Sequence, residues 1–195
     1  KNVDRSKFSL TKIMNGSDPK GYNTLMSDVD EIAKQLKRLS DADVPVLFRP
    51  LHEASGGWFW WGADGSEAYK KLWQAIYDKL TNEYKLDNII WVWNGQAANW
   101  YPGDEYVDII GEDIYPGTRD YSAQSSKYLE ATDYSPNGKI VALTENGCLF
   151  DLDKAFDANT AWSYFGTWSG EFCISSSEKY TEKSMWPVSY THLRA

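Results

Sequence analysis

Apolar residues recur along the chain with two different spacings, and each spacing predicts a different kind of element. Residues 22–39 and 66–84 carry apolar residues three and four positions apart, which is the spacing of one buried face of an amphipathic helix. Residues 121–132 repeat this pattern more weakly. The sequence therefore predicts three helices, the two stronger of which have these apolar faces: Met26, Val29, Ile32, Ala33, Leu36 and Leu39; Tyr69, Leu72, Trp73, Ile76, Tyr77 and Leu80.

Short, nearly continuous apolar runs predict strands between these helices. Five such runs occupy residues 44–48, 89–93, 107–111, 140–143 and 164–168. Runs of this kind are typical of parallel sheets whose two faces are both covered. Five parallel strands fit either an open α/β sheet or part of a (β/α)₈ barrel.

The polar residues that follow these strands favour the barrel. A (β/α)₈ barrel places its functional residues at the ends of many different strands, whereas an open sheet gathers them at one switch point. Here each candidate residue follows the C-terminal end of a predicted strand, and four strands contribute one or more: Arg49 and Glu53, then Asn94, then Asp113 and Tyr115, then Glu145. We therefore expect an α/β fold that is part of a (β/α)₈ TIM barrel, with about five of the eight strands present.

Composition narrows the classes of partner. The formal net charge is −8, which disfavours binding to the phosphates of nucleic acid, and no apolar run approaches the ~20 residues of a membrane span. Aromatic residues make up 15% of the chain, with ten Trp and thirteen Tyr. Such rings serve a core, an interface or a platform for the apolar face of a sugar, and composition alone does not choose among these.

The two cysteines give no metal site. Cys148 and Cys173 lack the spacing of metal ligands, so they form either one disulfide or two buried free thiols.

Two glutamates carry the strongest chemical signal. Glu53 follows the first predicted strand and Glu145 the fourth. Cleavage of a glycosidic bond needs one carboxylic acid to protonate the leaving oxygen and one carboxylate to meet the anomeric carbon, about 5–5.5 Å apart in retaining enzymes. Either glutamate alone would more often be a surface or helix-capping residue. Together with Arg49, His52 and the tryptophan-rich run beside Glu53, they predict a glycosidase site.

The segments around these residues resemble glycoside hydrolase family 26, which is best known for endo-β-1,4-mannanases. The chain contains, in this order, RPLHEASGGWFWWG, WVWNG, GEDIYP and TENG, and the resemblance covers about residues 20 to 186. It implies a (β/α)₈ barrel with an acid/base at the end of strand 4 and a nucleophile at the end of strand 7. The five predicted strands would then be strands 4 to 8.

The resemblance also implies roles for individual residues. Glu53 matches the acid/base and Glu145 the nucleophile, and the Tyr115 hydroxyl would support Glu145. Residues that match substrate-binding positions are Arg49, His52, Trp58, Asp113, Tyr115 and Trp168. The implied protein is a retaining endo-β-1,4-mannanase, a secreted or cell-surface monomer that binds a β-mannan polysaccharide and needs no metal or other cofactor.

Several alternatives stay open at this point. His52 could be a core histidine, and Trp60 and Trp61 could simply pack their loop. One of Trp91 and Trp93 is expected to face the core, so neither is assigned to the site. The substrate could be another β-glycan, such as β-1,3-xylan or mixed-linkage glucan, or the chain could be a non-catalytic carbohydrate-binding fragment or an interaction scaffold.

The sequence departs from the family pattern at both ends. The first three strands of the family, and a further substrate-contacting histidine, have no counterpart here. Residues 187–195 match nothing expected and are interpreted as a non-native tail, which leaves residues 1–186 as a partial catalytic barrel. We therefore expect the 195-residue chain alone to be poorly soluble or inactive, because an open barrel exposes strand edges.

Overall fold

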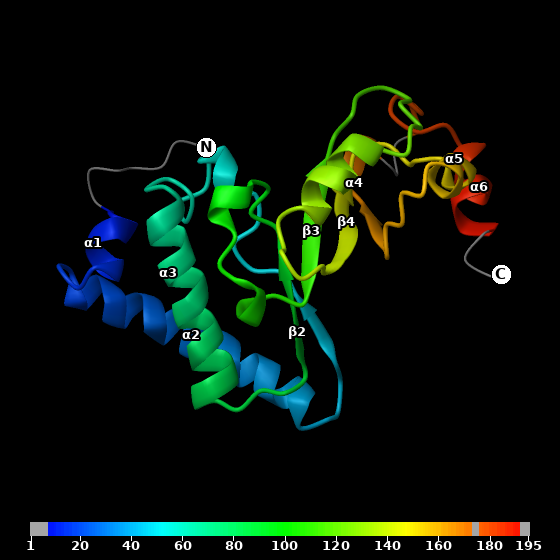
Figure 1. Cartoon of the computed structure of the whole chain (residues 1–195). Helices are drawn as coiled ribbons and strands as arrows, with labels where there is room; N and C mark the ends of the chain where they lie inside the picture. The colour runs from blue at the N-terminus through cyan, green and yellow to red at the C-terminus, as the bar shows by residue number, and fades with distance from the viewer. Residues whose placement is uncertain (1–7, 173–175, 192–195) are drawn as a thin grey trace. The chain divides into compact units, whose positions relative to one another are not determined.

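The computed structural model describes residues 8–172 and 176–191, so Cys173 and its possible pairing with Cys148 lie outside the described residues. The chain divides into two compact units, Lys1–Ile109 and Ile110–Ala195, which are described separately below. Figure 1 shows the helices and strands of each. Within the described ranges, no helix combines the length and the apolar character needed to cross a membrane.

The first unit contains the two strongly predicted helices. They are α2 (Pro19–Ser40) and α3 (Ser66–Tyr77), preceded by a short α1 (Leu10–Met14). Helix α2 starts at Asp18, whose side chain accepts a hydrogen bond from the Gly21 amide, with proline in the first turn. The α-helix predicted over residues 66–84 ends at Tyr77, earlier than expected. The chain then forms a π-helix over Asp78–Glu83.

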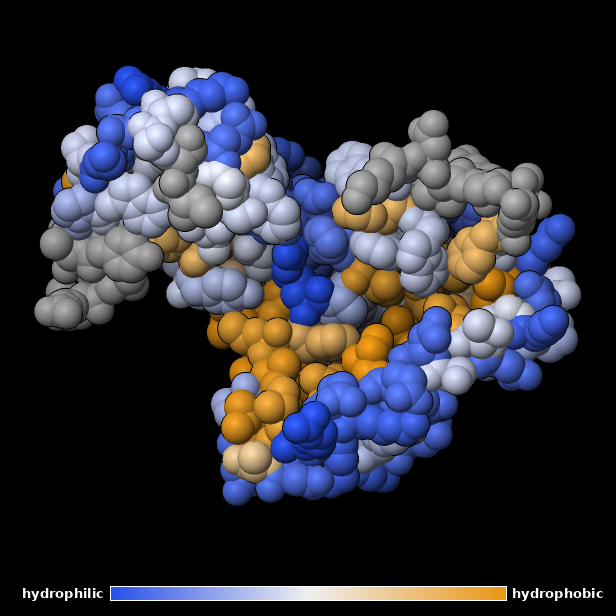
Figure 2. All heavy atoms as spheres, turned by 180° about the vertical axis from the view of Figure 1, so that it is seen from behind, coloured by the Kyte–Doolittle hydropathy of each residue, from blue (hydrophilic) through white to orange (hydrophobic). Residues whose placement is uncertain are grey.

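The apolar face of α2 is only partly buried. Met26, Val29, Ala33 and Leu36 are buried, whereas Ile32 and Leu39 are 45% and 39% exposed. Other large apolar side chains of this unit are also exposed, namely Val44, Leu47 and Ile90. Figure 2 shows apolar areas of the surface in orange beside hydrophilic ones.

The strands of the first unit pair in parallel and carry much of its aromatic core. β1 (Val46–Phe48) pairs with β2 (Ile89–Trp93) in a register that sets Phe48 beside Trp91. The rings of these two residues pack edge to face at 5.4 Å. Both tryptophans of β2 are buried, Trp93 completely. The sequence predicted that one of the two faces the core, and in the structure both are buried.

Three further strands, which lie in the second unit apart from Ile109, are β3 (Ile109–Ile114), β4 (Ile140–Asn146) and β5 (Phe165–Thr167). β4 and β5 are parallel, with an irregularity in register between Leu143 and Asn146. The strand predicted at 107–111 lies further along the chain, from Ile109 to Ile114. Every residue of this strand is buried.

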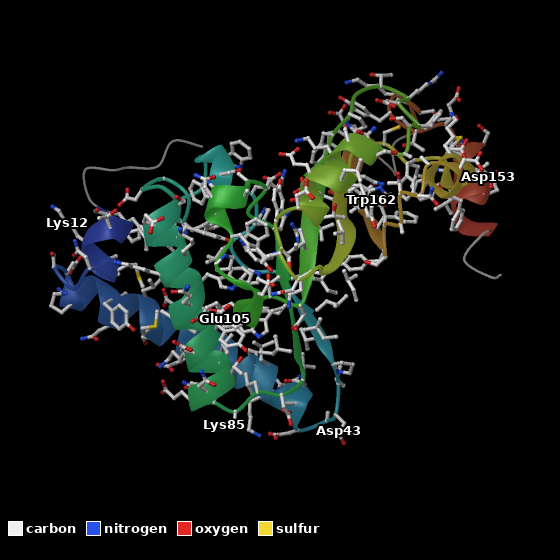
Figure 3. The ribbon with its side chains drawn as sticks, in the orientation of Figure 1. Lys12, Asp43, Lys85, Glu105, Asp153 and Trp162 are labelled. Carbon is white, nitrogen blue, oxygen red and sulfur yellow. The ribbon has the colours of Figure 1, made fainter. Side chains whose placement is uncertain are left out.

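Helices α4 (Ser125–Thr132), α5 (Leu152–Asp157) and α6 (Met185–Thr191) complete the second unit. Trp162, labelled in Figure 3, packs against the core and donates from Nε1 to the Ala123 carbonyl at 3.0 Å. The members of this core cluster are Ile114, Ala123, Leu143, Phe150 and Ala155.

Helix α6 carries part of the segment interpreted from the sequence as a non-native tail. Ser189 in this helix is buried and donates from Oγ to the Phe150 carbonyl at 3.2 Å. The interpretation of residues 187–195 as non-native stays a prediction.

One buried carboxyl of the second unit has an altered acidity. Glu112 on β3 is 2% exposed, and its Oε1 accepts no hydrogen bond from the part of the chain that the structure describes. Burial raises the pKa of this carboxyl to about 8, and the attraction of Lys127 offsets only part of the effect. Glu112 is therefore mainly neutral at neutral pH.

We predict that Glu112→Gln removes a pH-dependent loss of stability. The folded state holds the proton of Glu112 more tightly than the unfolded state, in which the pKa of this carboxyl has its ordinary value of 4.5. Glu112 therefore destabilises the fold as pH rises from 4.5 to about 8, by about 1.4 kcal/mol per pH unit. In thermal melting of the complete gene product, the Tm of the variant should equal that of wild type near pH 4.5. Across the window above this pH, its Tm should rise relative to that of wild type. The control is Glu105→Gln, an exposed carboxyl. Parallel curves for wild type and Glu112→Gln would contradict the prediction.

Candidate active site

The loop after β1 holds Glu53 in a constrained backbone conformation. Leu51 and Glu53 have φ values of 55° and 52°, in the left-handed region that non-glycine residues seldom adopt. Two backbone hydrogen bonds hold this loop to the end of β2: the Glu53 amide donates to the Asn94 carbonyl at 2.7 Å, and the Ser55 amide to the Gly95 carbonyl at 3.2 Å. The paired strands therefore fix the position at which the Glu53 side chain starts.

A tryptophan side chain donates a hydrogen bond to the Glu53 carboxyl. Trp58 donates from Nε1 to Glu53 Oε2 at 3.2 Å, and the ring is 49% exposed. A Cβ atom on Gly56 would lie 2.0 Å from this ring, so only glycine lets the indole fold over the loop. Trp58 thus both orients one oxygen of Glu53 and presents a partly open aromatic surface beside it.

Arg49 and His52 precede Glu53 in the same loop, and each has different contacts. Arg49 donates from Nη1 to Oδ1 of the fully buried Asn94 at 2.7 Å, a charge-assisted hydrogen bond. His52 is half-buried, with ring centroids 4.8 Å from Phe59 and 5.7 Å from Trp61. His52 therefore borders the Glu53 loop and is not part of the buried core.

Trp61 packs its own loop, which is one of the two interpretations that the sequence left open. Its ring stacks on Phe59 at 4.4 Å with an interplanar angle of 14°, and its Nε1 donates to the His52 carbonyl at 2.8 Å.

In the second unit, Tyr115 fixes the carboxyl of Glu145. Glu145 lies near the end of β4 and is 5% exposed. The Tyr115 hydroxyl donates to its Oε2 at 2.6 Å, a short hydrogen bond of the charge-assisted kind. A Cβ on Gly147 would lie 2.5 Å from the Tyr115 ring, so glycine at this position allows the ring to reach the carboxyl.

Asp113 is held by a threonine that the sequence analysis did not single out. Thr144 Oγ1 lies 2.7 Å from Asp113 Oδ1 and 3.1 Å from the Glu112 carbonyl, and its single proton serves one acceptor at a time. Gly111 makes room for this side chain, because a Cβ there would lie 2.6 Å from the Thr144 methyl.

Trp168 follows β5, and its backbone is tied to the end of β4. Its amide donates to the Asn146 carbonyl at 2.9 Å, and its ring is 43% exposed.

Each unit thus gathers its own share of the predicted residues. The first joins Arg49, His52, Glu53 and Trp58 on one loop, and the second links Tyr115 to Glu145 and Asp113 to Thr144. The sequence placed Asn94 after a predicted strand without assigning it a role, and it did not single out Thr144. Asn94 and Thr144 lie within WVWNG and TENG, two of the segments that resemble the family. This position in the sequence could have pointed to them as site residues.

The comparison that decides the family is a match to the model of glycosyl hydrolase family 26 over residues 2–191. The chain belongs to this family. It is 43% identical over 178 residues to the mannan endo-1,4-β-mannosidase of Thermothelomyces thermophilus, a match that covers 90% of this chain and 36% of that protein. The chain thus spans about a third of the length of this curated relative.

Solved structures of two β-mannanases agree with the fold. The Podospora anserina GH26-CBM35 β-(1,4)-mannanase superposes with a TM-score of 0.82 at 40% identity, covering 89% of this chain and 38% of that one. A β-mannanase from a symbiotic protist of the termite Reticulitermes speratus, complexed with gluco-manno-oligosaccharide, gives 0.80 at 39% identity, covering 86% and 52%. These matches confirm the predicted fold class of this family 26 chain, a partial (β/α)₈ barrel.

We predict that Arg49 and Asn94 stabilise the Glu53 loop as a pair. A double-mutant cycle of Arg49→Met and Asn94→Ala should give a coupling free energy of about 1.5–3 kcal/mol, because the bond joins a charged donor to a fully buried acceptor. Urea unfolding of the complete gene product measures it. As a control, Asn82→Ala removes an exposed amide bond to Asp78 and should cost under about 0.5 kcal/mol. A coupling near zero would contradict the pairing.

Proposed function

We propose that this chain supplies the catalytic carboxylates of a retaining endo-β-1,4-mannanase, with Glu53 as acid/base and Glu145 as nucleophile. The observation that carries the proposal is the 2.6 Å hydrogen bond from the Tyr115 hydroxyl to the nearly buried Glu145, in a family 26 chain. Its relatives include a mannan endo-1,4-β-mannosidase at 43% identity. The substrate proposed is accordingly a β-mannan, galactomannan or glucomannan.

The nucleophile role suits the surroundings of Glu145. With Tyr115 bonded to Oε2, the carboxyl has a fixed orientation, from which it would attack the anomeric carbon. Holding a nucleophile in one orientation lowers the entropic part of the barrier. The attack forms a covalent glycosyl-enzyme and inverts the anomeric centre for the first time.

The acid/base role suits the surroundings of Glu53. Its side chain is half-buried, so water can reach it, and Trp58 holds one of its oxygens. In the first step Glu53 protonates the leaving glycosidic oxygen. In the second it takes a proton from water, which attacks the glycosyl-enzyme and restores the original anomeric configuration.

The half-exposed rings of Trp58 and Trp168 are proposed as platforms for sugar rings. Each offers a flat apolar surface of the kind that stacks on the C–H face of a pyranose. Arg49, His52 and Asp113 would contact sugar hydroxyls from their own units. The complete protein would act as a secreted or cell-surface monomer, and the proposed steps use only these side chains and water.

We predict that Glu53→Gln and Glu145→Gln each lower the rate of reducing-sugar release from β-mannan by at least about 1,000-fold in the complete gene product. Tyr115→Phe should cost less, about 10- to 100-fold, because it removes only the bond that orients Glu145. Glu105→Gln serves as an exposed control. An aryl β-mannoside with a good leaving group distinguishes the two roles: Glu53→Gln should accumulate a glycosyl adduct on the peptide containing Glu145, visible by mass spectrometry.

Wild-type activity of either glutamine variant would refute the catalytic assignment. Activity on β-1,3-xylan or mixed-linkage glucan without activity on β-mannan would refute the substrate while preserving the mechanism.

A further inference from the structure

A cavity lies beside the Glu53 loop, within the first unit, and plays no part in the steps above. Its volume is about 520 Å³, within the range of roughly 300–1,000 Å³ that small-molecule sites occupy. It is formed by Trp60, Phe8, helix α1 and the first turns of α2. Trp60 stands two positions beyond Trp58 in the chain, so the cavity shares a loop with the proposed acid/base. We call it the Trp60 cavity.

Aromatic contacts brace Trp60 from two sides. Its ring meets Phe8 edge to face at 5.3 Å and Trp61 edge to face at 5.5 Å. Trp61 is itself held by its stack on Phe59 and its bond to the His52 carbonyl. The indole of Trp60 is therefore a fixed wall of the cavity and does not serve only as loop packing.

Hydrogen bonds also fix the opposite walls. Asp64, three residues after Trp61, accepts from the Ser9 hydroxyl and from the Thr11 amide, both at 2.9 Å, and so ties the start of α1 to the tryptophan-rich loop. Asp18 accepts from the Gly21 amide at 2.8 Å and fixes the start of α2. A site with walls set before the ligand arrives loses little conformational entropy on binding.

The lining combines aromatic rings with polar groups of both signs. Trp60 and Phe8 supply the rings, and Asp18, Lys20, Thr24 and Asp28 supply acceptors and donors. Carboxylates and an ammonium group together suit a neutral ligand rich in hydroxyls better than a strongly charged one. A pyranose has this chemistry, because its C–H face stacks on a ring while its hydroxyls hydrogen-bond at the edges.

We propose that the Trp60 cavity binds a pyranose residue of the polysaccharide, at a distance along the chain from the bond that is cleaved. The identity of that sugar rests on the proposed function, whereas the binding of a pyranose at Trp60 does not. Because the cavity lining contains none of the residues proposed to act on the cleaved bond, a substrate long enough to occupy both places would gain this contact, and a shorter one would not.

The test compares long and short substrates with the complete gene product. Trp60→Ala should raise KM for polymeric β-mannan and long manno-oligosaccharides about 3- to 10-fold, the effect of losing one aromatic stacking partner, and leave kcat unchanged. Cleavage of a short aryl β-mannobioside should be unaffected. Trp60→Phe should keep most of the affinity for long substrates, since it retains a ring. An unchanged ratio of long to short activity in Trp60→Ala would overturn the proposal.

Two further variants guard against a general loss of fold. Lys20→Ala and Asp28→Ala change exposed side chains of the cavity, so both should melt like wild type and still raise KM for long substrates. Leu129→Ala, an exposed change on α4 in the second unit, is the control and should alter neither substrate. If Lys20→Ala and Asp28→Ala both left KM for long substrates unchanged, the proposed contact of these polar side chains with the sugar would be refuted.

A binding measurement separates this proposal from the proposed function. Calorimetric titration of Glu53→Gln with mannohexaose, cellohexaose and β-1,3-xylohexaose measures binding without turnover. Binding of one of them that weakens on adding Trp60→Ala supports the cavity, even if wild type fails to cleave β-mannan. Binding that Trp60→Ala does not change, or no binding of any of the three, refutes it.

Discussion

Parallel pairing of neighbouring strands is the constraint on which the candidate site depends. Because paired parallel strands end at the same edge, residues far apart in sequence come within hydrogen-bonding distance there. In the first unit the end of β2 accepts the amides of Glu53 and Ser55, and Asn94 accepts the Arg49 guanidinium. In the second, the end of β4 accepts the Trp168 amide. Each unit therefore positions its glutamate through a strand pair and does not rely on a free loop.

Close approach of backbone and side chain then refines those positions. The left-handed conformations of Leu51 and Glu53 cost free energy, about 1–3 kcal/mol each, which the bonds to the end of β2 offset. Gly56 and Gly147 act differently, since each leaves space that a Cβ would fill, one for Trp58 and one for Tyr115. In both units a ring reaches its glutamate only because the neighbouring residue is glycine. Gly56 of the GGW segment and Gly147 of the TENG segment thus each make room for a ring that bonds to a carboxyl.

The sequence predicted most of the elements and much of the site, and the differences have physical causes. The strand runs and the faces of α2 and α3 follow from strong periodicity, but the end of α3 shifts into a π-helix, a change that periodicity does not reveal. Helices α5 and α6 are too short to show a periodic face. Glutamates and aromatic residues could be assigned from motifs. The partners of Thr144 and Asn94 could not be predicted, because they depend on which side chain lies opposite on the neighbouring strand or on the loop that follows it.

Strand alternation gives two adjacent carboxyls of β3 opposite environments. Successive side chains of a strand point to opposite faces, so the carboxyls of Asp113 and Glu112 have different surroundings. Asp113 accepts the Thr144 hydroxyl, on the same strand as Glu145, and is one of the proposed site residues. Glu112 is buried on the other face, where desolvation raises its pKa to about 8 and keeps it mainly neutral. A carboxyl that must lose its charge to be buried weakens the fold as pH rises. The strand that positions Asp113 and leads into Tyr115 therefore carries a stability cost on its opposite face, which hydrogen bonds at the site do not relieve.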